Sequence, residues 1–400
     1  MESKTIILTP FTGYAVVIYH LMKNDGFSFI FTDNNSLLYG KKYDGIEIVS
    51  AEDVNEKYID AKVIVCSDRH KDVIDKQYKC FGFIDIETDF RRFIIRDGLN
   101  AAIESVNFEQ LNEIRPRQCA IIRNKFFLLN PEPTDDQLII DSVGISITSR
   151  CSLRCKDCMT LMQYYQKPED YPLDINIKAF DVFMENVDFV REFGIFGGEP
   201  FLYQQNLPQF LQSLGNSVHI KKIGLLLIAT NGTIVPDEKT LKAVKQHEIH
   251  VCMSDYGANT KNIDSVVDAF NKHGIDYAHI KNQHWHPVSK IVNGDNVSDE
   301  EAKIRYENCR FKCNTISKGK FFACAFLASA HDLQAIPDNT ENYVDLLSKS
   351  ITKSDIACYL RRHDSGQGYP GCRWCSGADT STIIKAGTQI REPLPYNRYT

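Results

Sequence analysis

The sequence predicts an α/β protein with an N-terminal parallel sheet, a curved and partly closed parallel βα barrel, and a small C-terminal lobe. Three observations lead to this fold class. Residues 1–125 and residues 139–290 each alternate short apolar runs with helical patterns, as parallel sheets with crossover helices do. Residues 300–400 have weaker periodicity and hold six of the 13 cysteines. Because crossovers between parallel strands are right-handed, the middle segment is expected to curve into a barrel.

The N-terminal segment, 1–125, has the alternation of a small Rossmann-like sheet. Apolar runs at 4–10, 27–33 and 61–68 predict strands. Helical patterns cover 15–23 and 71–79. Strands separated by helices in this way favour parallel pairing.

The turn between the first strand and the first helix is a candidate nucleotide site. Residues 10–14 can place a phosphate at the N-terminus of a helix, and Asp33 follows the second strand, where a ribose-binding acid would lie. The three-glycine fingerprint of dinucleotide-binding proteins is absent from this turn. A nucleotide site and a nucleotide-free docking domain both remain open.

Residues 126–138 are expected to be a linker, since they contain two prolines within three residues and a pair of aspartates. Five barrel strands are predicted after it, at 143–148, 189–196, 223–229, 250–254 and 275–280. Helical patterns separate them, at 177–187, 207–214, 238–247 and 263–272. The expected architecture is a curved, partly closed parallel βα barrel, whose functional edge is formed by the carboxyl ends of its strands.

Composition excludes several classes of protein. The chain has 46 basic and 52 acidic residues, a formal net charge of −6, which gives no support to nucleic-acid or membrane-surface binding. The apolar run 223–229 is too short to span a bilayer, and the first residues lack the features of a signal peptide. We therefore expect a cytoplasmic protein. In a reducing compartment, clustered thiols indicate metal or iron–sulfur ligands rather than disulfides.

The first cysteine cluster directly follows the first barrel strand. Cys151, Cys155 and Cys158 have the spacing C-x3-C-x2-C. Three thiolates on one short loop can hold three irons of a cubane cluster and leave the fourth iron open to a ligand. A zinc site would normally require a fourth side-chain ligand.

Polar and small residues follow the next three strands. Two glycines after the second strand let a ligand approach the backbone, and the glutamate beside them can hold a cationic amino group. Because these strands are parallel, their carboxyl ends meet at one edge of the barrel. The residues at these ends are Gly197, Gly198 and Glu199, then Asn231, then Ser254 and Asp255.

In the order of these motifs, the chain resembles the radical S-adenosylmethionine superfamily over about residues 139–290. The resemblance implies a partial (βα)6 barrel. It also implies a [4Fe–4S] cluster on the three clustered cysteines, with S-adenosylmethionine chelating the open iron. Gly197, Gly198 and Glu199 match the motif that binds the methionine amino group, and Ser254 and Asp255 match the strand end that contacts the ribose.

The resemblance implies a radical reaction. One electron from the reduced cluster cleaves the cofactor into methionine and a 5′-deoxyadenosyl radical, which abstracts a hydrogen atom from the substrate. One residue departs from the pattern: the position before the third cysteine is usually aromatic and packs near the adenine, but here it is Asp157. Met159 or Tyr164 is expected to supply that contact instead.

The second cysteine group resembles the auxiliary-cluster lobe of the Twitch or SPASM type. It contains a hairpin signature, in which Gly319 precedes Cys324, and a C-x2-C pair. The resemblance implies one auxiliary [4Fe–4S] cluster, with structural zinc as the alternative for four thiolates. The expected ligands are Cys309, Cys324, Cys372 and Cys375, with Cys313 as an alternate for Cys309.

The leading functional hypothesis is a radical enzyme that acts on a small polar substrate, a nucleotide-linked or phosphorylated sugar or a cyclitol, by oxidation or epimerisation. Cys358 is a candidate donor of a hydrogen atom to a substrate radical, with a core thiol or alternate ligand as the plainer interpretation. The expected electron donor is a flavodoxin or a ferredoxin. The alternatives are modification of a ribosomally made peptide, activation of a partner protein, and a non-enzymatic electron-transfer protein.

Overall fold

The computed structural model describes residues 4–55, 57–67, 70–94, 97–123, 137–282, 284–309, 313–364, 366–377, 379 and 381–399. The chain divides into two compact units, residues 1–131 and 132–400. The predicted linker, 126–138, lies outside the described residues apart from its last two positions. None of the helices in the described part of the chain could cross a lipid bilayer, because none is both long and apolar enough.

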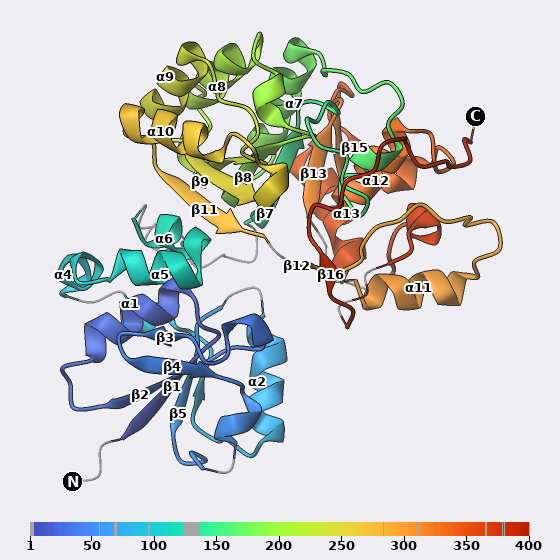
Figure 1. Ribbon diagram of the computed structural model, residues 1–400. Helices are drawn as coiled ribbons and strands as arrows, with labels where there is room; N and C mark the ends of the chain where they lie inside the picture. Colours follow the sequence, from blue (N-terminus) through green and yellow to red (C-terminus); the bar gives the residue numbers. More distant parts are fainter. Residues whose placement is uncertain are drawn as a thin grey trace. The chain divides into compact units, whose positions relative to one another are not determined.

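A six-stranded sheet forms the middle of the first unit (Figure 1). Its central pairs are parallel, with Ile7 opposite Ile30 on one side and Val63 on the other. Only β3 is antiparallel to its neighbour, β4. In spatial order the strands are β3 (Lys42–Tyr43), β4 (Ile46–Val49), β2 (Ser28–Thr32), β1 (Thr5–Thr9), β5 (Lys62–Val65) and β6 (Ile86–Glu87).

Helices cover both faces of this sheet, because successive side chains of β1 point to opposite faces. Ile6 and Leu8 pack in a core with α1 (Gly13–Met22) and the later helices, whereas Ile7 packs in a second core with α2 (Lys71–Cys80). The later helices are α3 (Arg91–Ile94), α4 (Leu99–Glu104), α5 (Phe108–Ile114) and α6 (Pro116–Arg123).

The second unit contains an eight-stranded sheet whose first five strands follow the predicted barrel. They are all parallel. The sixth parallel strand, β13, does not continue the βα repeat. It belongs to the C-terminal segment and pairs with β7 on the side opposite β8. In chain order the strands are β7 (Ile139–Ser146), β8 (Phe189–Phe196), β9 (Ile223–Thr230), β10 (His250–Asp255), β11 (Tyr277–Lys281) and β13 (Asn314–Ser317).

The helices between the barrel strands lie at the outer side of this sheet in Figure 1. They occur where the sequence predicts them, with boundaries shifted by at most four residues. Their apolar faces pack into one core with the strands. They are α7 (Leu173–Glu185), α8 (Leu207–Gly215), α9 (Glu238–Gln246) and α10 (Ile263–His273).

The C-terminal lobe continues the barrel sheet through two antiparallel strands, β14 (Lys320–Phe322) and β15 (Tyr343–Asp345). The short strands β12 (His284–Trp285) and β16 (Ile384–Lys385) form a separate antiparallel pair. One hydrophobic core includes residues of both the barrel and the lobe. The lobe helices are α11 (Asp299–Glu307), α12 (Ala325–Asp332) and α13 (Lys353–Asp364).

Short 3₁₀ turns complete the fold. They are η1 (Ser36–Leu38), η2 (Glu52–Val54), η4 (Met162–Tyr164), η5 (Pro200–Leu202), η6 (Ile220–Lys222), η7 (Gly257–Asn259), η8 (Thr340–Asn342) and η9 (Pro370–Trp374). The predicted α/β fold class, with a parallel sheet in each half and a C-terminal lobe, is confirmed.

Candidate functional site

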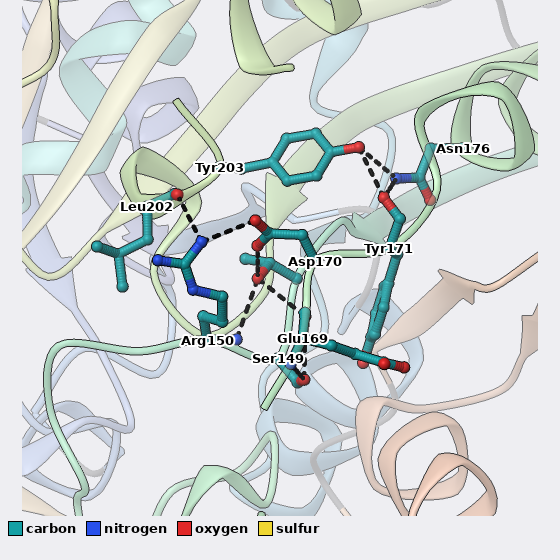
Figure 2. A network of polar contacts seen from close by, with 9 residues as sticks. Ser149, Arg150, Glu169, Asp170, Tyr171, Asn176, Leu202 and Tyr203 are labelled. Atoms are coloured by element: carbon teal, nitrogen blue, oxygen red, sulfur yellow. Dashed lines mark hydrogen bonds and ion pairs between the residues drawn. The ribbon is translucent and has the colours of Figure 1, made fainter. Parts of the chain in front are cut away.

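The loop that carries the first cysteines is fixed at its start by charged and polar contacts. Arg150 Nη1 donates to Asp170 Oδ2 at 2.8 Å and to the carbonyl of Leu202 at 3.3 Å, as Figure 2 shows. Thr148 Oγ1 donates to the other oxygen of Asp170 at 2.6 Å. These bonds join the end of β7 to the segment before α7 and to η5, so they hold the first residues of the cysteine loop in place.

A second group of contacts in Figure 2 holds the segment before α7 at Tyr171, the residue after Asp170. The hydroxyl of Tyr203 donates to the carbonyl of Tyr171 at 2.7 Å, and Asn176 Nδ2 lies 3.4 Å from that carbonyl. All three residues are buried. The Tyr171 carbonyl is therefore held by Asn176 of α7 and by Tyr203, which follows η5.

The two glycines after β8 are needed because the cysteine loop passes directly over them. A Cβ on Gly197 would lie 2.4 Å from the Thr148 carbonyl oxygen, and one on Gly198 would lie 2.1 Å from that of Arg150. Backbone bonds replace the missing side chains: the N–H of Gly198 donates to Thr148 at 2.8 Å. In the structure the atoms nearest to the missing side chains belong to the start of the cysteine loop, and the approach of a ligand to these glycines stays a prediction.

Glu199 is fully buried and accepts three hydrogen bonds from the protein. Oε1 accepts from the N–H of Phe201 at 3.0 Å and from Thr230 Oγ1 at 2.8 Å, and Oε2 accepts from the N–H of Asn231 at 2.7 Å. Burial raises the pKa of Glu199 to about 7, although these bonds lower it. The carboxyl group thus joins the ends of β8 and β9, and its contact with a cationic amino group stays a prediction.

Each of the three sulfurs has one side-chain hydrogen-bond partner. Asn231 Nδ2 lies 3.6 Å from Cys151 Sγ. Gln389 Nε2 lies 3.1 Å from Cys155 Sγ. Thr160 Oγ1 lies 3.2 Å from Cys158 Sγ. The sequence offered no signal for Thr160 and Gln389, because neither belongs to a motif.

The same sulfurs are costly to ionise without a metal. Burial raises the pKa of the Cys151 thiol strongly, and burial together with the neighbouring Cys158 raises that of Cys155 to about 11. Iron ions bind the thiolate form and supply the positive charge that the buried site lacks. Three thiolates on one loop, each beside a polar side chain, therefore fit the predicted [4Fe–4S] cluster.

The residue before the third cysteine, Asp157, forms an ion pair. Asp157 Oδ1 lies 3.1 Å from Lys290 Nζ. Of the two residues expected to replace the family's aromatic residue, Met159 lines the cavity of the second cysteine group, and Tyr164 is buried against Tyr396. The adenine contact predicted for Met159 or Tyr164 has no direct support in this arrangement.

The end of β10 places Ser254 and Asp255 beside two rings. Asp255 Oδ2 pairs with His279 Nε2 at 2.9 Å, and its Oδ1 accepts from the N–H of Gly257 at 2.8 Å. Burial raises the pKa of Tyr256 well above its usual value, with a hydrogen bond to Ser254 opposing and the three cysteines of the loop raising it further. The ring of Tyr256 packs edge-on against Trp285, with the ring centroids 5.3 Å apart.

The second cysteine group surrounds a cavity of about 50 Å³. Four thiols line it, together with Met159, Tyr306 and Tyr369. Within the described ranges, no three His, Cys, Asp or Glu side chains converge on a single metal ion. Four sulfurs around one space are the donor set of a cubane cluster. The thiols are those of Cys309, Cys324, Cys372 and Cys375.

Two other cysteines of the C-terminal lobe are not among the residues that line this cavity. Cys313 is not among the described residues that line the cavity, so the geometry favours Cys309 as the ligand. Cys358 is exposed on α13, where Arg361 Nη2 lies 2.6 Å from its sulfur. This position gives no support to Cys358 as a hydrogen-atom donor, because such a donor must face the substrate.

The candidate nucleotide site of the first unit is filled by the protein's own side chains. Asp33 Oδ2 accepts from the N–H of Phe11 at 3.0 Å and from Arg115 Nη2 at 2.5 Å. Gln118 Oε1 accepts from the N–H of Gly13 at 2.7 Å. Two N–H donors of the turn, and the acid that would bind a ribose, are therefore already paired, which favours the docking interpretation.

Comparison with known proteins gives partial matches. No known family profile matches the chain. It is 28% identical over 183 residues, 43% of this chain and 55% of that protein, to GTP 3',8-cyclase of Helicobacter pylori strain HPAG1. A second match is to GTP 3',8-cyclase of strain J99, 31% identical over 96 residues, 24% of this chain and 28% of that protein. The chain spans about half the length of the first of these relatives and less than a third of the length of the second.

Two solved structures are similar only at low scores. One is native anSMEcpe with bound AdoMet, with 14% identity, a TM-score of 0.38, and coverage of 59% of this chain and 88% of that chain. The other is Streptococcus suis SuiB bound to precursor peptide SuiA, with 15% identity, a TM-score of 0.27, and coverage of 65% and 73%.

The motif order, the parallel barrel and the site geometry agree with the predicted resemblance to the radical S-adenosylmethionine superfamily, and that resemblance is confirmed. The predicted S-adenosylmethionine and the predicted [4Fe–4S] cluster on three cysteines agree with that resemblance. The auxiliary cluster stays a proposal. The residues assigned to bind S-adenosylmethionine and the auxiliary cluster stay proposals.

Proposed function

We propose that the chain uses a [4Fe–4S] cluster on Cys151, Cys155 and Cys158 to start radical chemistry with S-adenosylmethionine. The observation that carries the proposal is the convergence of the β8 and β9 ends on the cysteine loop. The N–H of Glu199 donates to the Arg150 carbonyl at 2.7 Å, and Asn231 lies beside Cys151.

The protein's part in this reaction is positioning. When bound and reduced, the cluster supplies the electron that cleaves S-adenosylmethionine and yields a 5′-deoxyadenosyl radical for hydrogen abstraction. Gly197 and Gly198 keep the cysteine loop close to β8, and Glu199 fixes the turn at Asn231. Ser254 and Asp255, at the end of β10, are assigned to the ribose, with His279 holding the Asp255 carboxylate in place.

We further propose a small polar substrate, a nucleotide-linked or phosphorylated sugar or a cyclitol, that is oxidised or epimerised. An auxiliary cluster on the four thiols of the second cavity would accept the electron that an oxidation releases. Because Asp33 and two N–H groups of the adjacent turn are already paired, the first unit gives no support to a nucleotide-linked substrate. Substrate binding is therefore assigned to the second unit.

Two other substrate classes belong in the same experiment. The relatives are named for GTP, a phosphorylated nucleoside, and one similar structure is described with a precursor peptide.

A flavodoxin or ferredoxin is proposed as the electron donor, and the cytoplasm as the compartment.

The test measures 5′-deoxyadenosine formed by the anaerobically reconstituted, reduced chain. Cys155→Ala should abolish this product, because the cluster loses one of three ligands. Cys80→Ala is the matched control, since that cysteine is exposed on α2 in the first unit. Equal product from both variants would contradict the assignment.

The substrate is found by adding pools to the same reaction. Nucleotide sugars, sugar phosphates and cyclitols should raise 5′-deoxyadenosine above the level without substrate. Stimulation by GTP alone, or by peptides alone, would replace the proposed substrate class while leaving the radical chemistry intact.

A further inference from the structure

Residues 387–391, the strap segment, lie along the cysteine loop although they are far from it in sequence. The N–H of Lys156 donates to the Thr388 carbonyl at 2.8 Å, and the N–H of Ile390 donates to the Arg154 carbonyl at 3.0 Å. Cys155 and Gln389 form an isolated antiparallel bridge between these two bonds. The strap is therefore paired with the loop as a short strand would be.

The side-chain amide of Gln389 has a fixed orientation. Its Oε1 accepts from the N–H of Arg154 at 2.7 Å, and a backbone N–H can only donate. Its Nε2 must then face the other way, where it lies 2.7 Å from the Gly387 carbonyl and 3.1 Å from Cys155 Sγ. The two hydrogens of the amide serve these two acceptors, so the contact with sulfur is a donated bond.

The strap is also anchored to the β10 side of the barrel. Asn259 Nδ2 donates to the Gly387 carbonyl at 2.9 Å. Gly387 has a φ of +65°, and a Cβ there would lie 3.0 Å from Tyr256. The strap is thus held from both sides, which limits how far the Gln389 amide can move from the sulfur.

Gln389 has the shortest of the three contacts with the loop sulfurs. The matching distances are 3.6 Å for Asn231 and 3.2 Å for Thr160. Asn231 also orders the turn after β9, where its Oδ1 accepts from the N–H of Thr233 at 3.0 Å. Gln389 can therefore be changed without disturbing the ends of the barrel strands.

We propose that Gln389 is a positioning residue that raises the reduction potential of the first cluster by donating a hydrogen bond to the Cys155 thiolate. A reduced cluster carries one more negative charge than an oxidised one, so a donor to its sulfur stabilises the reduced form more. This inference rests on the proposed cluster at Cys151, Cys155 and Cys158, and it adds a residue that lies outside the motifs.

The experiment is a redox titration of the reconstituted full chain, followed by electron paramagnetic resonance. The signal that changes when S-adenosylmethionine is added reports the first cluster, and the auxiliary cluster serves as an internal reference. Gln389→Met keeps the length of the side chain but cannot donate. Gln389→Glu keeps the acceptor for the Arg154 N–H and replaces the donor with an oxygen.

Both variants should shift the midpoint potential of the first cluster to more negative values and leave the auxiliary cluster unchanged. Thr388→Ala is the matched control, because that side chain donates to the Lys385 carbonyl at 3.2 Å and, among the described residues, makes no hydrogen bond to a cysteine sulfur. It should keep the wild-type potential.

Three outcomes would overturn the inference. One is a wild-type potential in both Gln389 variants, and another is an equal shift in the Thr388 control. The third is loss of the first cluster in both Gln389 variants, which would assign the strap to cluster assembly instead of tuning. A wild-type chain with no cluster that responds to S-adenosylmethionine would instead refute the proposed function itself.

Discussion

Gly198→Ala is expected to remove the first cluster while leaving the fold and the auxiliary cluster in place. The new Cβ would lie 2.1 Å from the Arg150 carbonyl oxygen and 2.9 Å from Cys151 Cβ. Real Cβ contacts stay above 3.0 Å, so the loop must retreat by almost 1 Å. That movement breaks the 2.7 Å bond from the buried Glu199 N–H to the same carbonyl.

The cost has two parts. Overpacking costs about 1–3 kcal/mol. A buried N–H left without an acceptor costs about 1–3 kcal/mol more. The sum, roughly 2–6 kcal/mol, falls on the loop that holds the cysteines. Iron and sulfide analysis after anaerobic reconstitution should therefore show only the auxiliary cluster.

Gly194→Ala is the matched control for this prediction. Gly194 lies on the same strand, β8, and a Cβ there would first meet Leu227 Cδ1 at 3.5 Å, an ordinary contact. This variant should bind iron as the wild type does. Full iron content and an unchanged cluster signal in Gly198→Ala would refute the packing argument.

Three more predictions can be measured on the full chain. Cys309→Ser should lose the auxiliary cluster and Cys313→Ser should keep it by iron analysis, since only the first thiol lines the cavity; equal loss would contradict this assignment. Burial lowers the pKa of His20 to about 4 from 6.5, so the first unit should lose about 3 kcal/mol of unfolding free energy as the pH falls from 6.5 to 4. Urea unfolding should show less of this pH dependence in His20→Gln, and the same loss there would refute the attribution. Arg115→Met should destabilise the first unit by about 3 kcal/mol, because the buried Asp33 carboxylate loses its cation. A calorimetric transition at the wild-type temperature would speak against it.

The sequence predicts the barrel well because its signals are local. Each strand is a short apolar run, each helix has one apolar face, and both patterns depend on neighbours within a few positions. The predicted strand 189–196 coincides with β8, and the predicted start of the helix at 207 is that of α8. The pairing of β13 with β7 could not be predicted in this way, because it joins residues about 170 positions apart.

The candidate site was predictable to the extent that its residues form motifs. The spacing of Cys151, Cys155 and Cys158 is visible in the sequence, and so are the two glycines. The reason for the glycines is not, since it depends on where the cysteine loop lies in space. Gln389 has no motif at all, and only the folded chain brings it to Cys155.

The bridge between the strap and the cysteine loop also bears on the order of events during protein synthesis. Gln389 follows Cys155 by 234 positions. At about 5–20 residues per second, it leaves the ribosome roughly 10–50 s after the cysteine does. Throughout that interval the nascent loop has its three thiols but lacks the strap, and in the earlier part of it the chain also lacks β13. Metal delivered to an unfinished chain meets an open loop, and the environment of the first cluster is completed only after translation has passed residue 389.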